Sequence, residues 1–223
     1  VGSFYEMYGI REDDIVKEIA QLLNIALTRR DKKIKEINTK NPYMIGFTSI
    51  SISKYLRVLL NHNYTVVRID QVTPPPNPKR KVVKIYSPST SLDEYDMKDT
   101  NYMLCLFIET INEKMCIGMT LIDLTTGNSI VYEVYDSKNK TDKYVALQEA
   151  YRFIYTFHPK EIVIYAEDCK MTKDDLINYL ELDTIIHYFY DKYDHTFGKI
   201  SYQNEFLGKI YEKCGLLTPI QFL

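Results

Sequence analysis

Three apolar segments in close succession restrict the folds open to the second half of this chain. They occupy residues 102–111, 115–124 and 129–135, and only short polar turns separate them. Such spacing predicts an antiparallel meander, because hairpins need only short connections. Helix-like and strand-like segments then alternate, with helices at 142–157 and 173–180 and strands at 161–165 and 185–190. Meander strands followed by alternating units predict a mixed α/β sheet.

The first half of the chain has a different pattern. Apolar spacing predicts two helices, at 11–24 and 50–62, and three strands, at 25–28, 64–69 and 81–86. Four prolines within residues 74–78 remove backbone donors and predict a stiff loop. The polar stretch 87–100 is the natural linker. We therefore expect two domains, at residues 1–95 and 100–223.

The distribution of charge supports this division. Residues 1–90 carry 15 Lys and Arg against 8 Asp and Glu, a net charge of +7, whereas residues 91–223 carry 13 against 22, a net charge of −9. The first segment can approach a polyanion, and the second would be repelled by one at close range. A simple drift of charge along the chain is the alternative interpretation.

Several classes of protein are disfavoured by what the sequence lacks. No apolar run approaches the roughly 18 residues that a membrane span requires, so we expect no membrane association. The four cysteines have no C-x-x-C spacing, which argues against a zinc ribbon and a dense disulfide framework and favours a reducing intracellular compartment. The histidines show no ligand spacing, so no metal site is expected. Gly198-Lys199 and Gly208-Lys209 lack the phosphate-loop frame, so we expect no ATP site and no other cofactor within these residues.

Phe4-Tyr5-Glu6 is the segment with the most distinctive chemistry. It precedes the first helix between Gly2 and Gly9, so we expect a tight connection from which its side chains stand out. A phenylalanine ring can wedge between base pairs, at a cost of a few kcal/mol that is lowest where pairing is already broken. A carboxylate beside DNA must accept from a base N–H or become protonated and donate. Considered alone, Phe4 is more often a core residue.

The order of these and later motifs resembles the MutS mismatch-repair family over most of the chain. Residues 1–8 resemble the family segment G-x-F-Y-E-[LM]-[FY], and residues 21–30 resemble L-L-x-I-x-L-T-[KR]-R. Met44-x-Gly46 followed by Tyr55-Leu56 fits the next helix of the family. Further similarity lies in residues 67–71, 79–85 and 88–90, and more loosely in 117–118 and 121–127. The chain departs from the family at Thr48-Ser49-Ile50, often Pro-Tyr-His, and at Ser89, usually Gly.

The resemblance implies a fold and a function. It implies a small mixed α/β mismatch-binding domain at 1–95, followed by an RNase H-like α/β connector domain at 100–223. The implied function is recognition of mismatched or damaged double-stranded DNA, with Phe4 as the intercalating wedge and Glu6 as the partner of the mismatched base. The other residues expected to contact DNA are Met44, Arg30, Arg80 and Lys81. The basic side chains among them can neutralise phosphates and position the wedge.

The resemblance also implies properties of a longer parent protein. That protein would be a DNA-dependent ATPase whose ATP and magnesium are bound in C-terminal sequence beyond residue 223. It would form a homodimer or heterodimer and interact with a MutL-like repair protein. Residues 1–223 themselves are expected to contain no catalytic residue.

Two other functions remain open from the residues alone. RNase H-like sheets can bind two metal ions through clustered carboxylates, so a metal-dependent nuclease is one alternative. Its candidate ligands are Glu109, Asp123, Glu149 and Glu167, although structural or surface roles suit them better. The second alternative is an interaction module that does not bind DNA. For the lysines at 32–35 we favour a solvated surface over a DNA contact.

Overall fold

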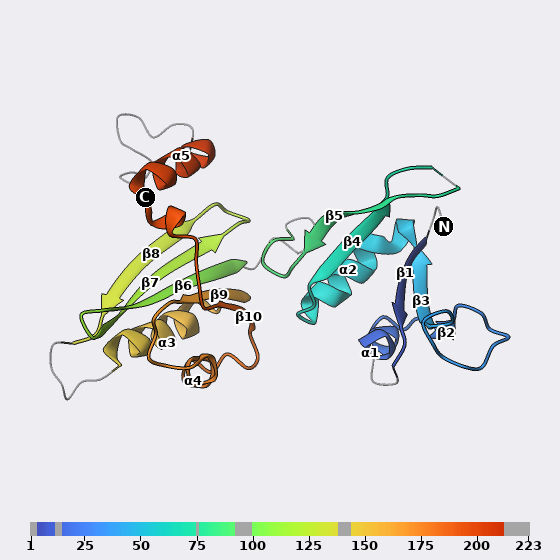
Figure 1. Ribbon diagram of the computed structural model, residues 1–223, viewed down its shortest axis with the longest axis horizontal. Helices are drawn as coiled ribbons and strands as arrows, with labels where there is room; N and C mark the ends of the chain where they lie inside the picture. Colours follow the sequence, from blue (N-terminus) through green and yellow to red (C-terminus); the bar gives the residue numbers. More distant parts are fainter. Residues whose placement is uncertain (1–3, 12–14, 75, 92–99, 138–143, 212–223) are drawn as a thin grey trace. The chain divides into compact units, whose positions relative to one another are not determined.

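The chain divides into two compact units, which are described separately. The computed structural model describes residues 4–11, 15–74, 76–91, 100–137 and 144–211 (Figure 1). Unit 1 comprises Val1–Lys98 and unit 2 comprises Asp99–Leu223. Within the described ranges, no helix is long and apolar enough to cross a membrane.

Unit 1 contains a three-stranded antiparallel sheet in the order β1-β3-β2. The strands are β1 (Phe4–Gly9), β2 (Thr28–Arg29) and β3 (Tyr43–Thr48). Helix α1 (Ile15–Leu22) buries Val16, Ile19 and Ala20 in a cluster that also contains Ile45 of β3. This helical spacing puts one apolar stripe of α1 toward the sheet, and that packing leaves the other face of β1 and β3 open.

A second helix and a hairpin complete unit 1. After a 3₁₀ turn, η1 (Ser49–Ser51), come α2 (Ile52–Asn61), β4 (Val66–Gln71) and β5 (Arg80–Tyr86). Strands β4 and β5 form an antiparallel pair with an irregularity between Arg68 and Ile69. Leu56 and Leu60 of α2 pack with Tyr86 at the end of β5, so the helix covers one side of the hairpin.

The edge strand β1 is linked to β4 by a network of partly buried side-chain hydrogen bonds. The Tyr5 hydroxyl donates to Asp70 Oδ1 at 3.1 Å. Arg68 donates from Nε to Asp70 Oδ1 at 2.9 Å and from Nη2 to Oδ2 at 2.6 Å, and its guanidinium lies 5.3 Å from the centre of the Tyr5 ring. The hydrogen bonds from Arg68 lower the pKa of Asp70; burial opposes this shift, and the bond from Tyr5 adds to it. This network joins residues 65 positions apart in sequence.

Unit 2 is built on a five-stranded mixed sheet in the order β10-β9-β6-β7-β8. The meander consists of β6 (Tyr102–Ile111), β7 (Lys114–Asp123) and β8 (Ser129–Tyr135), and β9 (Glu161–Ala166) and β10 (Ile186–Tyr190) add to β6 in parallel. Helix α3 (Val145–Phe157) precedes β9, and α4 (Lys173–Tyr179) precedes β10. Fully buried Leu106, Ile117, Leu147 and Ile164 are part of the core between the sheet and its helices. The chain continues through η3 (His195–Gly198) and α5 (Ile200–Ile210), shown in red in Figure 1.

The predicted mixed α/β class is confirmed, and the meander strands lie where the apolar segments predicted them. The tight connection expected at Phe4-Tyr5-Glu6 is wrong, because this segment pairs with β3 as the strand β1. Met44 is likewise part of a strand and not of a helix. The strand expected at 25–28 is reduced to Thr28–Arg29, and α5 was not expected.

The expected linker at 87–100 is wrong over its first residues. Ser87, Ser89 and Ser91 are buried, because a turn at 88–90 folds this segment back on itself. The Ser87 carbonyl accepts from the amides of Thr90 and Ser91, which satisfies polar groups that burial would otherwise leave unpaired. Residues 92–99 of that linker, and residues 12–14 and 142–143 of two expected helices, lie outside the described residues.

We predict that Leu106→Ala lowers the free energy of unfolding of unit 2 by about 2–5 kcal/mol, because it leaves a cavity among fully buried side chains. Urea denaturation followed by circular dichroism measures this change. Val131→Ala, at a strand position that is 60% exposed, is the matched control and should cost less than about 1 kcal/mol. Equal losses for the two variants would contradict the position of the core.

We predict that Asp70→Asn lowers the stability of unit 1 by about 1–2 kcal/mol at pH 7, because it weakens the hydrogen bonds to Arg68 and Tyr5. The pKa of Asp70 is lower in the folded state than its ordinary value of 3.8, so its stabilisation is complete above that value and is lost as pH falls through the folded pKa. Thermal unfolding between pH 7 and pH 2 should therefore depend less on pH in the variant. The exposed carboxylate variant Glu36→Gln is the control, and an unchanged acid dependence for Asp70→Asn would contradict the network.

Candidate nucleic-acid interface

The open face of the unit 1 sheet displays the residues that the sequence singled out. Side chains alternate along a strand, so Phe4, Glu6 and Tyr8 share one face of β1 and Tyr5 lies on the other. All three side chains on the first face are exposed, and Phe4 keeps 54% of its surface accessible. A phenylalanine in a core would be buried. The exposure of Phe4 therefore excludes the interpretation that it is a core anchor of unit 1.

Strand β3 contributes Met44 to the same face. The antiparallel register places Thr48 opposite Phe4, Gly46 opposite Glu6 and Met44 opposite Tyr8, and residues that pair directly project to the same side. Gly46 leaves space for its neighbour: a Cβ atom there would lie 3.2 Å from the Tyr5 carbonyl oxygen and 3.4 Å from Glu6 Cγ. The structure thus places Phe4, Glu6 and Met44 on one face of the sheet.

A hydrogen bond between two residues of β1 orients the carboxylate on this face. The Tyr8 hydroxyl donates to Glu6 Oε2. Partial burial, followed by this bond to Glu6, raises the pKa of Tyr8, so the hydroxyl keeps its proton at neutral pH. Tyr8 therefore acts as a fixed donor to Glu6 and leaves the other carboxylate oxygen available to a ligand.

Two of the three predicted basic residues lie within electrostatic range of this pair. The positive charges of Arg30 and Arg80 oppose the rise in the pKa of Tyr8. Arg30 directly follows β2, and Arg80 begins β5. Lys81 pairs with Asp70 in the hairpin register and so faces the side opposite to Arg80. The structure therefore groups Arg30 and Arg80 with the open face and separates Lys81 from them.

Sequence reasoning missed Tyr8, and it missed the residues that hold β1 in place. Tyr5, Arg68 and Asp70 form the network described above, and none of them was predicted as a site residue. The available signal was the similarity of residues 67–71 to a family segment that ends in an acidic residue and Gln. That motif marks Asp70, but nothing in it points to Tyr5.

Three of the four carboxylates considered for a nuclease have other partners in unit 2, and the fourth, Glu109, lies opposite Cys116 in the β6–β7 register. Buried Asp123 accepts from the Thr125 amide at 2.9 Å and from its hydroxyl at 2.6 Å, which closes the turn after β7. Glu149 forms an ion pair with Arg152 at 2.5 Å, and Glu167 lies 3.6 Å from His195. In the part of the chain that the structure describes, no three His, Cys, Asp or Glu side chains gather into a group that could hold a metal ion.

Comparisons with known proteins identify the family of the chain. Residues 1–95 match the family model described as MutS domain I. Over 242 aligned positions the chain is 36% identical to a mutS homolog of Acanthamoeba polyphaga mimivirus, covering 98% of this chain and 21% of that protein. It is 33% identical over 183 positions to the DNA mismatch repair protein MutS of Thermodesulfovibrio yellowstonii, covering 80% of this chain and 18% of that protein.

The chain thus spans about a fifth of the length of these relatives. Among solved structures, a Marinitoga piezophila Argonaute in complex with a guide RNA aligns with a TM-score of 0.28 and 14% identity, over 42% of this chain and 16% of that one. The MutS domain I model matches residues 1–95 of the chain, and the two relatives align with most of the chain. This chain belongs to the MutS family.

Proposed function

We propose that the open face of β1 and β3 recognises mismatched or damaged double-stranded DNA. The observation that carries this proposal is the position of Phe4, an aromatic side chain 54% exposed on an open sheet face beside Glu6. The relatives named DNA mismatch repair proteins support it. The net positive charge of residues 1–90 supports an approach to the phosphate backbone.

In this proposal Phe4 senses the loss of pairing. Its ring enters between adjacent base pairs, and the cost of opening the step is lowest where the bases are already mispaired. Glu6 accepts from a base N–H with the carboxylate oxygen that Tyr8 does not occupy. Met44 adds an apolar contact from the neighbouring strand. Discrimination then arises from the difference in opening cost between paired and mispaired steps.

The basic side chains are assigned to the DNA backbone. Arg30 and Arg80 neutralise phosphates beside the wedge, and Lys81 does so from the other side of the hairpin. Such contacts position the protein but carry no sequence information. Their contribution is therefore expected to be the same for matched and mismatched duplexes.

We further propose that unit 1 is the mismatch-recognition domain and unit 2 the connector domain of a longer protein. The strand order of unit 2, a meander followed by two parallel strands, supports an RNase H-like connector. The net charge of −9 over residues 91–223 opposes a close DNA interface. ATP hydrolysis with magnesium, dimerisation and contact with a MutL-like protein are assigned to the longer protein, and this chain is proposed to supply recognition without catalysis.

We predict that Phe4→Ala weakens binding to a mismatched duplex by about 5- to 150-fold, the range expected for losing one stacked aromatic, and leaves binding to matched duplex nearly unchanged. Competition binding with labelled duplexes that differ by one base pair measures both values. Phe206→Ala, a 50% exposed phenylalanine on α5, is the matched control and should change neither. Severe loss of thermal stability with intact discrimination would show that Phe4 supports the fold instead.

We predict that Arg30→Ala and Arg80→Ala each weaken matched and mismatched binding by similar factors, because both residues contact phosphates. Each should also reduce the slope of log K against log salt by about one. Salt titrations of both duplexes provide the measurement, with Arg152→Ala in unit 2 as the control. A loss restricted to the mismatched duplex would mean that these arginines read bases.

A further inference from the structure

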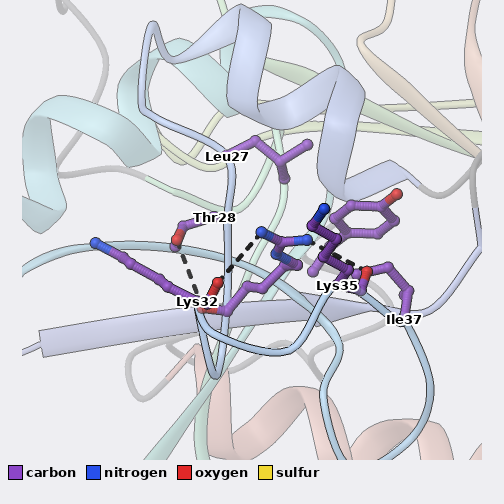
Figure 2. Close-up of a pocket in the computed structure, with 7 residues that line it drawn as sticks. Leu27, Thr28, Lys32, Lys35 and Ile37 are labelled. Carbon is purple, nitrogen blue, oxygen red and sulfur yellow. Dashed lines mark hydrogen bonds between the residues drawn. The ribbon is translucent and has the colours of Figure 1, made fainter.

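A recess lies beside the loop that connects β2 and β3 (Figure 2). Its volume is about 370 Å³, within the range of roughly 300–1,000 Å³ that is typical of small-molecule sites. Its lining consists of three cationic residues, three apolar or aromatic ones and one threonine: Arg29, Lys32, Lys35, Leu27, Ile37, Tyr43 and Thr28. None of the residues lining the recess is acidic.

Two strand residues that line the recess, Arg29 and Tyr43, lie on the face of the sheet opposite to Phe4, whereas Thr28 lies on the Phe4 face. The register pairs Thr28 with Met44 and Arg29 with Tyr43. Since Met44 shares the face of Phe4 and neighbouring residues alternate, Arg29 and Tyr43 project to the other side. A ligand held by Arg29 and Tyr43 would therefore lie on the face of the sheet opposite to a duplex bound at Phe4.

The loop that forms the rim, residues 30–42, is held in shape by two side chains. Arg29 donates from Nη1 to the Lys35 carbonyl at 3.2 Å and from Nη2 to the Lys32 carbonyl at 3.3 Å, as the dashed lines in Figure 2 show. The buried Asn41 accepts from the Asp31 amide at 2.7 Å and donates to the carbonyls of Ile34 and Glu36 at 3.1 and 2.9 Å. The folded loop thus forms the recess. The hydrogen bonds from Arg29 hold the backbone of Lys32 and Lys35 in place.

Positive charge and an aromatic wall meet at one side of the recess. Lys17 of α1 places its Nζ 4.9 Å from the centre of the Tyr43 ring, adding a further cation beside the lining residues. In Figure 2 Lys35 lies beside Ile37, whereas the Lys32 side chain extends away from the other labelled residues. Arg29, through the guanidinium N–H groups that do not bond the loop carbonyls, and Lys35 can therefore bind one anionic group. Tyr43, Leu27 and Ile37 offer a surface for a flat group.

We propose that this recess binds a mononucleotide, with its phosphate between Arg29 and Lys35 and its base against the apolar wall. Size, charge and the combination of polar and apolar lining all fit this class of ligand. A phosphate of bound DNA has the same chemistry, but the position of Arg29 and Tyr43 on the face opposite to Phe4 favours a free nucleotide. This site is independent of the proposed mismatch recognition.

Calorimetric titration of the chain with deoxyadenosine monophosphate tests the proposal, with deoxyadenosine and inorganic phosphate as separate probes. The nucleotide should bind more tightly than either part, and Lys35→Met should weaken its binding by about tenfold or more, because one charge-assisted contact is removed. Lys33→Met removes a lysine from the same loop that does not line the recess, and it should leave the affinity within about twofold. Phe4→Ala should have no effect.

Four results would overturn the proposal. The first is the absence of nucleotide binding at millimolar concentration. The second is equal affinity for the nucleotide and either inorganic phosphate or the nucleoside. The third is binding that is lost in Phe4→Ala but kept in Lys35→Met. The last is an effect of Lys35→Met on duplex binding alone, which would assign the recess to the DNA backbone. Lys35 is exposed, so its replacement leaves the fold intact, which circular dichroism verifies.

Discussion

The carboxylate of Asp70 is the constraint on which the geometry of unit 1 depends. It accepts from the Tyr5 hydroxyl and from two nitrogens of Arg68, and so it joins an edge strand to a hairpin that lies more than 60 positions away. Because side chains alternate along β1, holding Tyr5 inward presents Phe4 and Glu6 outward. A shift of β1 by a single residue would exchange the two faces. The contact between Tyr5 and Asp70, together with the register of β1 on β3, therefore keeps Phe4 and Glu6 on the open side.

Much of the fold could be predicted from the sequence. The elements that could not be predicted were missed for a common physical reason. The meander was predictable because its strands are long, its turns are short and its pairing is local. Strands β1 and β3 were not predictable, because apolar residues occupy both faces of each strand. The alternation of apolar and polar residues that marks a strand is therefore absent. Their pairing also spans about 40 residues, so no local pattern encodes it. The buried serines after β5 were misread as a linker because a local turn pairs their backbone groups.

The candidate site was predictable only in part for the same reason. Phe4, Glu6 and Met44 came from the resemblance of short motifs to a family, and the strand register places them on one face. The exposure of Tyr8 and the contact between Tyr5 and Asp70 depend on which face of β1 is directed outward. The sequence alone does not specify this face. Lys81 matched a family position, yet the hairpin register puts it on the side of Asp70. Motifs thus provided the candidate residues, whereas the strand register shows which of them share a face.

Gly46 sets how closely β3 can approach β1. A Cβ atom at position 46 would lie 3.2 Å from the Tyr5 carbonyl oxygen, which is a tight contact, and 3.4 Å from Glu6 Cγ, which is ordinary van der Waals contact. The tight contact is with backbone, so a side chain at position 46 would have to push β1 and β3 apart by a few tenths of an ångström. The effect of replacing Gly46 would therefore be transmitted through the backbone of β1 to its neighbours Phe4 and Glu6.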